Sequence, residues 1–422
     1  MTKTLVALAA MAVAGIASAQ STVTLFGVVD AGISYYETTS KYQNYPPRSI
    51  PQPDVKQSQW ALSNSGNASS RLGFRGQEDL GGGYAASFWL ESTLWNDVGT
   101  IGRAGVFFDR RSTVSLLGPF GEVRLGRDYT PTFWDDAVFD PFGVVGSGTS
   151  LIAQMLGGAL PTLTLNRGYY ARKANSIGYF LPPNLGGFYG QAMYGFNENV
   201  SSLPIEDDPK VANISRVGRY VGARVGYSTG PFDVALAYGS STLADNYHFG
   251  STTNANTANL GASYDFGVVK LYGEYSRVDV KTDFADIATF PFTPALTPPL
   301  DVNTRNFLVG LSIPVGASQI KMSYAQVKGE FFNFTRFGPV PMNTPDPKAD
   351  KVAIGYVYNL SKRTALYATF AVTKNENGAA VGVVNVASAD VAPGYFNTVN
   401  SNAPGYRADR GYGYDFGIRH AF

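Results

Sequence analysis

The C-terminal stretch GYGYDFGIRHAF, residues 411–422, has two unlike sides. Small or polar residues alternate with bulky ones, which are Tyr412, Tyr414, Phe416, Ile418, His420 and Phe422. A side-chain period of two is typical of a β-strand whose two faces meet different surroundings. The stretch therefore predicts a strand that runs to the last residue of the chain and carries aromatic and aliphatic side chains on one face.

The same alternation recurs along the chain and predicts sixteen strands. They lie near residues 22–36, 69–77, 84–95, 107–118, 121–129, 171–181, 188–197, 218–228, 232–242, 257–266, 268–280, 303–314, 318–330, 350–360, 364–375 and 412–422. Composition also favours an all-β fold, since aromatic residues make up 14% of the chain and Tyr and Phe prefer strands to helices. Charged residues make up only 15%.

Short and long connections alternate between these strands. Short, turn-like segments include EDLGGG at 78–83, GPFG at 118–121 and PVGA at 314–317. Long polar segments lie near 37–68, 96–106, 130–170, 198–217, 243–256, 281–302, 331–349 and 376–411. An even number of antiparallel strands with tight turns at one end and long loops at the other is the pattern of an outer-membrane β-barrel. Closure also removes the exposed edges of so long a sheet.

The polar face of the strands distinguishes a membrane barrel from a soluble sandwich, in which the apolar face would form the core. That polar face is largely Gly, Ser, Thr, Asn and charged residues, and aromatic residues gather near strand ends, as at Tyr35, Trp95 and Phe107. Aromatic girdles at both interfaces are typical of membrane barrels. Sixteen strands make a barrel too wide for side chains to fill, which leaves water inside. We therefore expect lipid outside and an aqueous lumen.

The N-terminus, MTKTLVALAAMAVAGIASAQ, has the pattern of a secretory signal peptide. Lys3 precedes an apolar stretch, and Ala17-Ser18-Ala19 is a small-residue cleavage site. We expect residues 1–19 to be removed and residues 20–422 to form one barrel domain in the outer membrane. The processed chain carries 32 basic and 32 acidic side chains, and this balance argues against nucleic acid as a partner. The chain has no Cys, so its stability comes without disulfides.

Four motifs in order resemble the Gram-negative general porins, in particular their neisserial and β-proteobacterial branch. They are VTLFGVVDAGISYY at 23–36, SSRLGFRGQEDLGGGYAASFWLES at 69–92, GEVRLGRDYTPTF at 121–133 and GIRHAF at 417–422. The resemblance implies a trimeric, non-enzymatic, sixteen-stranded diffusion channel for small hydrophilic solutes and ions, without a cofactor. It also implies outer-membrane lipid and lipopolysaccharide as surroundings, and Phe422 as the signal read by the barrel assembly machinery.

The third long loop, near residues 130–170, is unusually apolar for a solvent-exposed tip. In the family that the chain resembles, this loop folds into the barrel and narrows it. Its acids Asp135, Asp136 and Asp140 are then the predicted acidic side of a pore constriction. The motif Asp140-Pro-Phe-Gly is similar to the acidic tip of related porins, but here the acid precedes the proline. Which of the three acids lies at the constriction therefore stays open.

Arginines on the polar face are predicted to form the basic wall opposite that loop. Arg71 and Arg75 share the polar face with Gly73 by parity, and the resemblance places further constriction arginines at Arg127 and Arg172. Strict alternation would turn Arg127 to the apolar face, so its role requires a kink at Gly126. Parity also selects Arg111 and Arg124 as polar-face residues. The whole predicted basic wall is Arg71, Arg75, Arg111, Arg124, Arg127 and Arg172.

Acids and arginines on opposite sides of an eyelet would set up a transverse field, and fixed charges of this kind bias which ions enter. The arginine cluster favours anions. A substrate-specific channel for a sugar or an organic acid is the nearest rival; an aromatic track along the lumen would indicate it, but only Phe26 and Trp89 fall on the polar face. An adhesive barrel with a plugged lumen and a barrel enzyme are more distant rivals. The two histidines, 248 and 420, are far apart in sequence, so neither a metal site nor a catalytic site is expected.

Overall fold

The computed structural model describes most of the chain. The described residues are 22–43, 50–103, 105–154, 170–199, 216–246, 251–284, 300–335, 338–341, 346–384, 393–396 and 405–422. The predicted signal peptide, residues 1–19, lies outside them. Among the described residues no helix is long and apolar enough to cross a bilayer.

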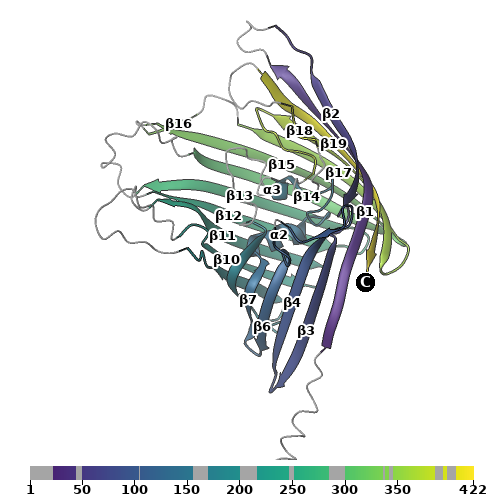
Figure 1. Cartoon of the computed structure of the whole chain (residues 1–422), viewed down its shortest axis with the longest axis vertical. Helices are drawn as coiled ribbons and strands as arrows, with labels where there is room; N and C mark the ends of the chain where they lie inside the picture. The colour runs from purple at the N-terminus through teal and green to yellow at the C-terminus, as the bar shows by residue number, and fades with distance from the viewer. Residues whose placement is uncertain are drawn as a thin grey trace, which may run out of the picture.

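Sixteen antiparallel strands form a closed barrel, and this confirms the predicted fold (Figure 1). They are β1 (Thr22–Gln43), β3 (Arg71–Gly81), β4 (Tyr84–Trp95), β6 (Arg111–Gly118), β7 (Gly121–Tyr129), β8 (Arg172–Phe180), β9 (Phe188–Gly195), β10 (Tyr220–Thr229), β11 (Phe232–Asn246), β12 (Ser251–Asp265), β13 (Lys270–Phe284), β14 (Leu300–Val315), β15 (Ser318–Thr335), β17 (Lys348–Asn359), β18 (Thr364–Glu376) and β19 (Gly405–Ala421). Three further strands extend the long-loop end: β2 (Val55–Asn64), β5 (Thr100–Ile101) and β16 (Gly338–Pro341).

The last strand closes the barrel against the first, as its two-sided pattern predicts. Val28 lies opposite Ala421, and Gly27 and Phe422 exchange two backbone N–H···O bonds of 3.1 Å. Phe416 and Ile418 face outward and are 55% and 46% exposed, whereas Gly413 and Asp415 on the other face are buried. β19 begins at Gly405, seven residues earlier than the alternation indicated, because its first residues pair with the last residues of the long strand β1.

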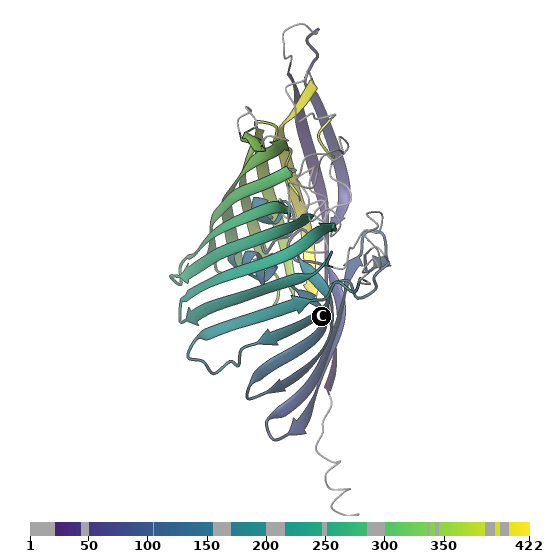
Figure 2. The same ribbon diagram turned by 90° about the vertical axis from the view of Figure 1, so that its left-hand side faces the viewer.

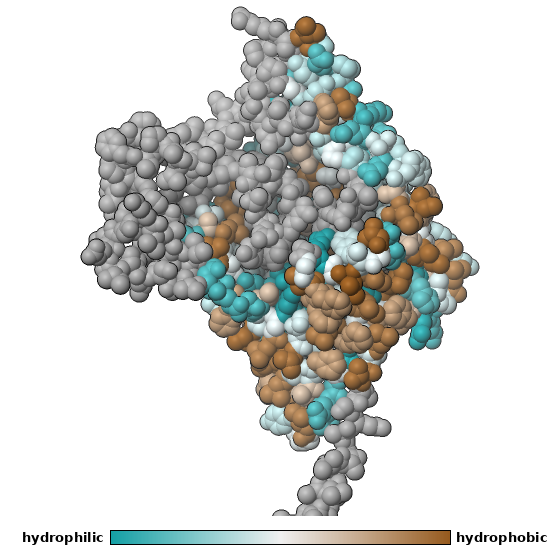
Figure 3. Space-filling view, viewed as in Figure 1, coloured by the Kyte–Doolittle hydropathy of each residue, from teal (hydrophilic) through white to brown (hydrophobic). Residues whose placement is uncertain are grey.

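The outer and inner faces of the other strands differ in the same way. Leu236, Leu260 and Val309 point outward and are at least 50% exposed. Asn259 and Ser276, on the inner face of adjacent strands, are buried and hydrogen-bonded to each other at 2.9 Å. Apolar side chains gather over the lower part of the outer surface, where the barrel meets hydrocarbon (Figure 3).

The third loop enters the barrel as two short helices, α2 (Pro131–Phe139) and α3 (Leu151–Gln154) (Figures 1 and 2). Thr130 caps α2 by accepting the N–H of Phe133 at 3.3 Å, and Pro131 occupies the first turn, where its missing N–H costs nothing. α2 packs on β10–β13 and α3 on β14, β15 and β17. The loop therefore lies along one wall of the lumen and faces β3–β8 across it.

A segment after β18 also lies in the lumen. Val381, Val383 and Val384 are at most 3% exposed, and Gln154 Nε2 donates to the Val383 carbonyl at 3.2 Å. Lys351 Nζ joins this segment to the third loop by donating to the Val383 and Thr149 carbonyls at 2.6 and 2.7 Å. The start of the last loop thus narrows the lumen together with the third loop.

Candidate functional site: the pore constriction

The inner face of β3, β4 and β6 carries arginines held against aromatic rings. The Arg75 guanidinium lies 5.2 Å from the Trp89 ring and 5.3 Å from the Phe26 ring, and those two rings are 5.0 Å apart. The Arg111 guanidinium lies 4.5 Å from the same Trp89 ring. Cations over aromatic faces are held by the ring quadrupole without losing their charge. Arg75 is exposed, so its charge faces the aqueous lumen.

Glu91 of β4 links two further arginines, Arg110 and Arg71. Its carboxylate accepts Arg110 Nε at 2.5 Å and Trp89 Nε1 at 3.0 Å, and lies 3.9 Å from Arg71. Arg110 also donates to the Tyr129 hydroxyl at 2.7 Å. Strict alternation with Arg111 would turn Arg110 to the apolar face. Arg110 can nevertheless contact Glu91, because it stands one residue before β6, where alternation no longer applies. No sequence signal beyond its position next to Arg111 indicates this contact.

Arg124 and Arg111 share the carboxylate of Asp128. Arg124 donates to Asp128, to Glu122 Oε1 at 2.8 Å, and its guanidinium lies over the Phe180 ring. Arg111 lies 3.8 Å from Asp128. These predicted wall arginines are therefore brought together, with acids interleaved between them on the same wall.

The backbone of β7 departs from regular strand geometry at Gly126. Gly126 has φ +126°, and an added Cβ would stand 2.1 Å from the Ser112 carbonyl, so only glycine fits there. The pairing of β7 with β8 shifts between Gly126 and Asp128. Arg127 Nε then donates to the Asp109 carbonyl at 2.7 Å. Arg172 lies 4.5 Å over the Tyr129 ring and donates to its hydroxyl at 2.9 Å.

The acids of the third loop lie elsewhere. Asp135 is fully buried and accepts Arg224 Nε of β10 at 2.8 Å. Burial raises the pKa of Asp135 to about 6, and the hydrogen bond and charge of Arg224 only partly offset that rise. The carboxylate is therefore paired with the wall behind the loop and not with the arginines across the lumen.

Asp136 is also fully buried and lies against β12 and β13. Its carboxylate accepts Asn259 Nδ2 at 2.6 Å and faces the buried carboxyl group of Glu274. Burial, and then the charge of Glu274, raises the pKa of Asp136 well above its usual range. Two buried carboxyl groups side by side repel each other when both are ionised, and a proton on Asp136 relieves that repulsion.

Asp140 organises the backbone of the loop. Its carboxylate accepts three backbone N–H groups, from Phe142, Val144 and Ser150, at 2.9, 3.1 and 3.0 Å. Burial raises its pKa, and these three bonds partly offset the rise. Asp140 is 4% exposed, so its charge is used within the loop.

The expected arrangement, with loop acids facing wall arginines across an eyelet, therefore differs from the structure. The reason is the helical phase of α2: Thr132, Asp135, Asp136 and Phe139 follow the i, i+3, i+4, i+7 pattern of one helix face, and this face is the buried one. The other face carries Trp134, which is 36% exposed, and the partly buried Val138. The side of the loop that faces the lumen is apolar.

In the part of the chain that the structure describes, no three His, Asp or Glu side chains gather where they could hold a metal ion. A closed sixteen-stranded barrel with a water-accessible, charged lumen narrowed by an internal loop defines a channel of the outer membrane.

Comparison with known proteins agrees with this class. A profile of the family described as Gram-negative porin matches residues 4–378, and the chain belongs to that family. Outer membrane porin protein 32 of Delftia acidovorans is 34% identical over the whole of both chains. An outer membrane porin of Bordetella pertussis is 31% identical over 91% of this chain and 98% of its own. Members of the family are non-enzymatic outer-membrane channels.

Solved structures show the same fold. The anion-selective porin from Comamonas acidovorans is 33% identical, with a TM-score of 0.68 over 96% of this chain and 100% of its own. OmpT of Vibrio cholerae, at 14% identity, has a TM-score of 0.57 over 96% of this chain and 99% of its own, and shares the fold alone.

Proposed function

We propose that this porin lets small hydrophilic solutes diffuse across the outer membrane and prefers anions, because its uncompensated constriction charge is positive. The single observation that carries the preference is the imbalance of charge along the β3–β8 wall. Seven arginines are held there by ring contacts, hydrogen bonds and ion pairs, and only three carboxylates form ion pairs with them. The arginines are Arg71, Arg75, Arg110, Arg111, Arg124, Arg127 and Arg172, and the carboxylates are Glu91, Glu122 and Asp128.

The loop acids add little to the field that an ion meets. Asp135 is paired with Arg224, Asp136 is fully buried and bound by Asn259, and Asp140 is surrounded by backbone N–H groups. Fixed charges that line a pore bias permeation when they face its water, as Arg75 does. The name of the similar Comamonas protein, an anion-selective porin, supports the same direction.

The outer face of β1, β2 and β19 supports a trimer as the functional assembly. It carries strongly exposed apolar side chains that lie side by side in register, including Ile33 at 58%, Leu62 at 59% and Trp60 at 69%. A contiguous apolar and aromatic surface of this kind suits a neighbouring subunit.

Two further proposals concern export and assembly. Phe422 is 42% exposed and is our proposed assembly signal. Residues 1–19 are our proposed signal peptide.

The test is the zero-current potential of single channels in a planar bilayer under a KCl gradient, for the native protein and for Arg75→Gln/Arg111→Gln. We expect the native sign to indicate chloride preference and the variant to lose most of it, because two cations of the wall are removed. Lys362→Gln/Arg363→Gln, which removes the same number of charges from the exposed turn before β18, is the matched control and should keep the native potential. An unchanged potential in the wall variant contradicts the proposal, and conductance that one organic acid blocks at low concentration indicates a substrate-specific channel.

A further inference from the structure

Four aromatic rings gather where the third loop leaves β7, and we call them the loop-side aromatic group. The Tyr129 ring lies parallel to the Phe133 ring, with 5.3 Å between the ring centroids and 9° between the planes, and 5.2 Å from the Trp134 ring. The Tyr170 ring stands edge-on to Phe133 at 5.6 Å. Trp134 is 36% exposed on the lumen side of α2. Because α2 lies inside the barrel (Figure 1), this group adds an aromatic surface to the lumen.

Arginines surround the hydroxyl group of Tyr129. Arg110 and Arg172 donate to it at 2.7 and 2.9 Å, and the Arg172 guanidinium lies 4.5 Å from the centre of the Tyr129 ring. Among the described residues, Arg172 forms no ion pair, and its buried Nε has no hydrogen-bond acceptor. Arg127 is close enough for its charge to act on Arg172. A carboxylate would compensate these two charges and accept the unpaired donor.

A second group of rings lies on the same wall, nearer the short turns. The exposed guanidinium of Arg75 lies over the rings of Trp89 and Phe26. Trp89 is level with Gly126 across β6, and Gly126 precedes Tyr129 by three residues, so the two groups are about 10 Å apart along the strands. A solute that crosses the constriction therefore meets an aromatic ring beside an arginine twice. We call the two groups together the aromatic–arginine track.

A flat aromatic anion matches the aromatic–arginine track better than an aliphatic anion does. Its carboxylate can accept hydrogen bonds from guanidinium groups, and its ring can stack on an indole or on the face of a guanidinium. An aliphatic acid of equal charge makes only the first of these contacts. One aromatic pair changes a binding constant about two- to tenfold. Binding of this strength favours entry and still lets the solute leave, as conduction requires.

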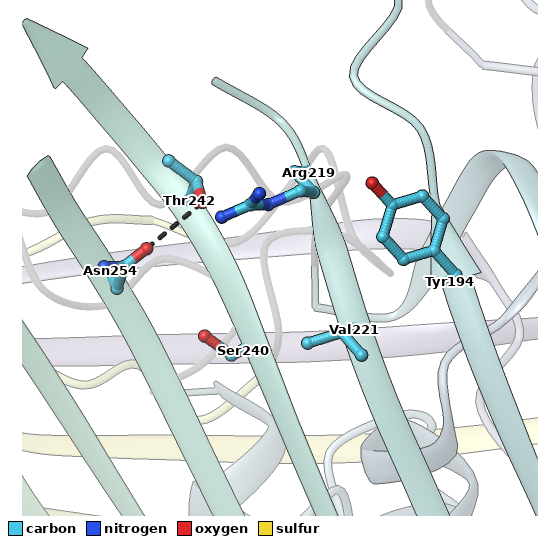
Figure 4. Close-up of a pocket in the computed structure, with 6 residues that line it drawn as sticks. All are labelled: Tyr194, Arg219, Val221, Ser240, Thr242 and Asn254. Atoms are coloured by element: carbon cyan, nitrogen blue, oxygen red, sulfur yellow. Dashed lines mark hydrogen bonds between the residues drawn. The ribbon is translucent and has the colours of Figure 1, made fainter. Parts of the chain in front are cut away.

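A tyrosine and an arginine also meet outside the lumen. A pocket on β9–β12 is lined by Tyr194, Arg219, Val221, Ser240, Thr242 and Asn254 (Figure 4). Val221 is 52% exposed and stands between the buried residues Tyr220 and Gly222, so the pocket opens on the outer surface of the barrel. A permeating solute does not pass this surface, and Tyr194 therefore offers a control for the rings of the track.

We propose that the aromatic–arginine track recognises planar aromatic carboxylates and lets them pass faster than aliphatic carboxylates of the same charge and ring size. The carboxylate would bind Arg172 and Arg127, where a donor lacks its acceptor, while the ring stacks on Trp134. The exposed guanidinium of Arg75 then offers the next surface toward the short turns. This inference rests on the proposed anion preference and deepens it: charge admits the anion, and the ring selects among anions.

The experiment compares benzoate with cyclohexanecarboxylate, which has the same charge and a six-membered ring without an aromatic face. Zero-current potentials of the purified protein in a planar bilayer, with KCl on one side and the potassium carboxylate on the other, give the permeability of each carboxylate relative to chloride. We expect the native protein to favour benzoate at least about threefold. Trp134→Leu should lower this preference at least about twofold and keep the native potential in a KCl gradient, because no charge changes.

Two further variants separate stacking from pore shape, since cyclohexanecarboxylate is also the thicker molecule. Trp134→Phe keeps a ring and should retain most of the preference for benzoate. Tyr194→Leu, in the outer pocket, should keep native values for both carboxylates.

Equal permeability of the two carboxylates in the native protein would overturn the inference, and so would a native preference in Trp134→Leu. Both outcomes leave the proposed anion preference standing as long as the KCl gradient shows chloride preference. A potassium preference in that gradient would overturn the proposed function and this inference together.

Discussion

The two walls of the lumen use the same residue types for different purposes. On the β3–β8 wall, Arg75 is exposed and lies against Trp89 and Phe26. On the β10–β13 wall, Arg224 is mostly buried and bound to the fully buried Asp135 of the third loop. The first arginine keeps its field for passing ions, and the second anchors a loop. Burial and partner, rather than residue type, decide which charge a solute meets.

The largest effect should come from breaking the anchor. Arg224→Met leaves Asp135 buried without its partner, and loss of one member of a buried ion pair costs about 3–5 kcal/mol. Urea unfolding in detergent micelles, followed by tryptophan fluorescence, measures the change. Arg75→Met, which removes an exposed arginine from the opposite wall, should lower the free energy of unfolding by less than about 1 kcal/mol. Equal losses in the two variants would show that the walls do not differ in this respect.

A second test displaces the loop without changing a charge. A Cβ at Gly413 of β19 would stand 2.6 Å from Ser147 Oγ, so Gly413→Val pushes the loop off this part of the wall. Overpacking of this kind costs about 1–3 kcal/mol. The single-channel conductance should change, and its steps should become less uniform. Gly273→Val, where no atom lies within 4 Å of the added Cβ, is the control and should keep native conductance.

The buried loop acids predict a dependence of stability on pH. The pKa of Asp135, about 6 in the folded protein, lies above its unfolded value, so the folded state binds more protons and stability falls as pH rises. The loss should begin near pH 4, be nearly complete by pH 7, and amount to about 3 kcal/mol from this group alone.

Asp136→Asn tests the neighbouring acid in the same measurement. The amide removes one ionisable group beside Glu274 while keeping a polar side chain of the same shape, so the fall in stability between pH 4 and pH 7 should become shallower. Glu78→Gln, near the exposed end of β3, should leave the curve unchanged. A curve of native slope in Asp136→Asn would show that this carboxyl group does not repel Glu274.

The smallest expected effect sharpens the comparison most. Asp136→Asn should leave the zero-current potential in a KCl gradient within error of the native value, because the carboxyl group is fully buried behind the loop. Arg75→Gln should shift that potential toward cations. If the two variants shift it equally in opposite directions, the loop acid faces the ions after all.

The strands and the kink in β7 could be predicted because both depend on residues close together in the chain. All sixteen strands, their up-and-down order and the closing partner of β1 follow from period-two alternation and from the lengths of the turns. The kink at Gly126 could be foreseen because Arg127 needed it and glycine alone permits it.

Which charges face water could not be predicted in this way, because it depends on contacts between distant segments. The partners of the loop acids, Arg224 and Glu274, are 89 and 138 residues away from Asp135 and Asp136, and the phase of α2 turns both acids toward them. Arg110 reaches Glu91 from outside the alternation that strand parity relies on.

Arg277 and Lys348 likewise lie in one line only because the registers of three successive strand pairings align them. Local patterns specify strands, whereas the environment of a charge depends on contacts that distant segments make after the barrel closes.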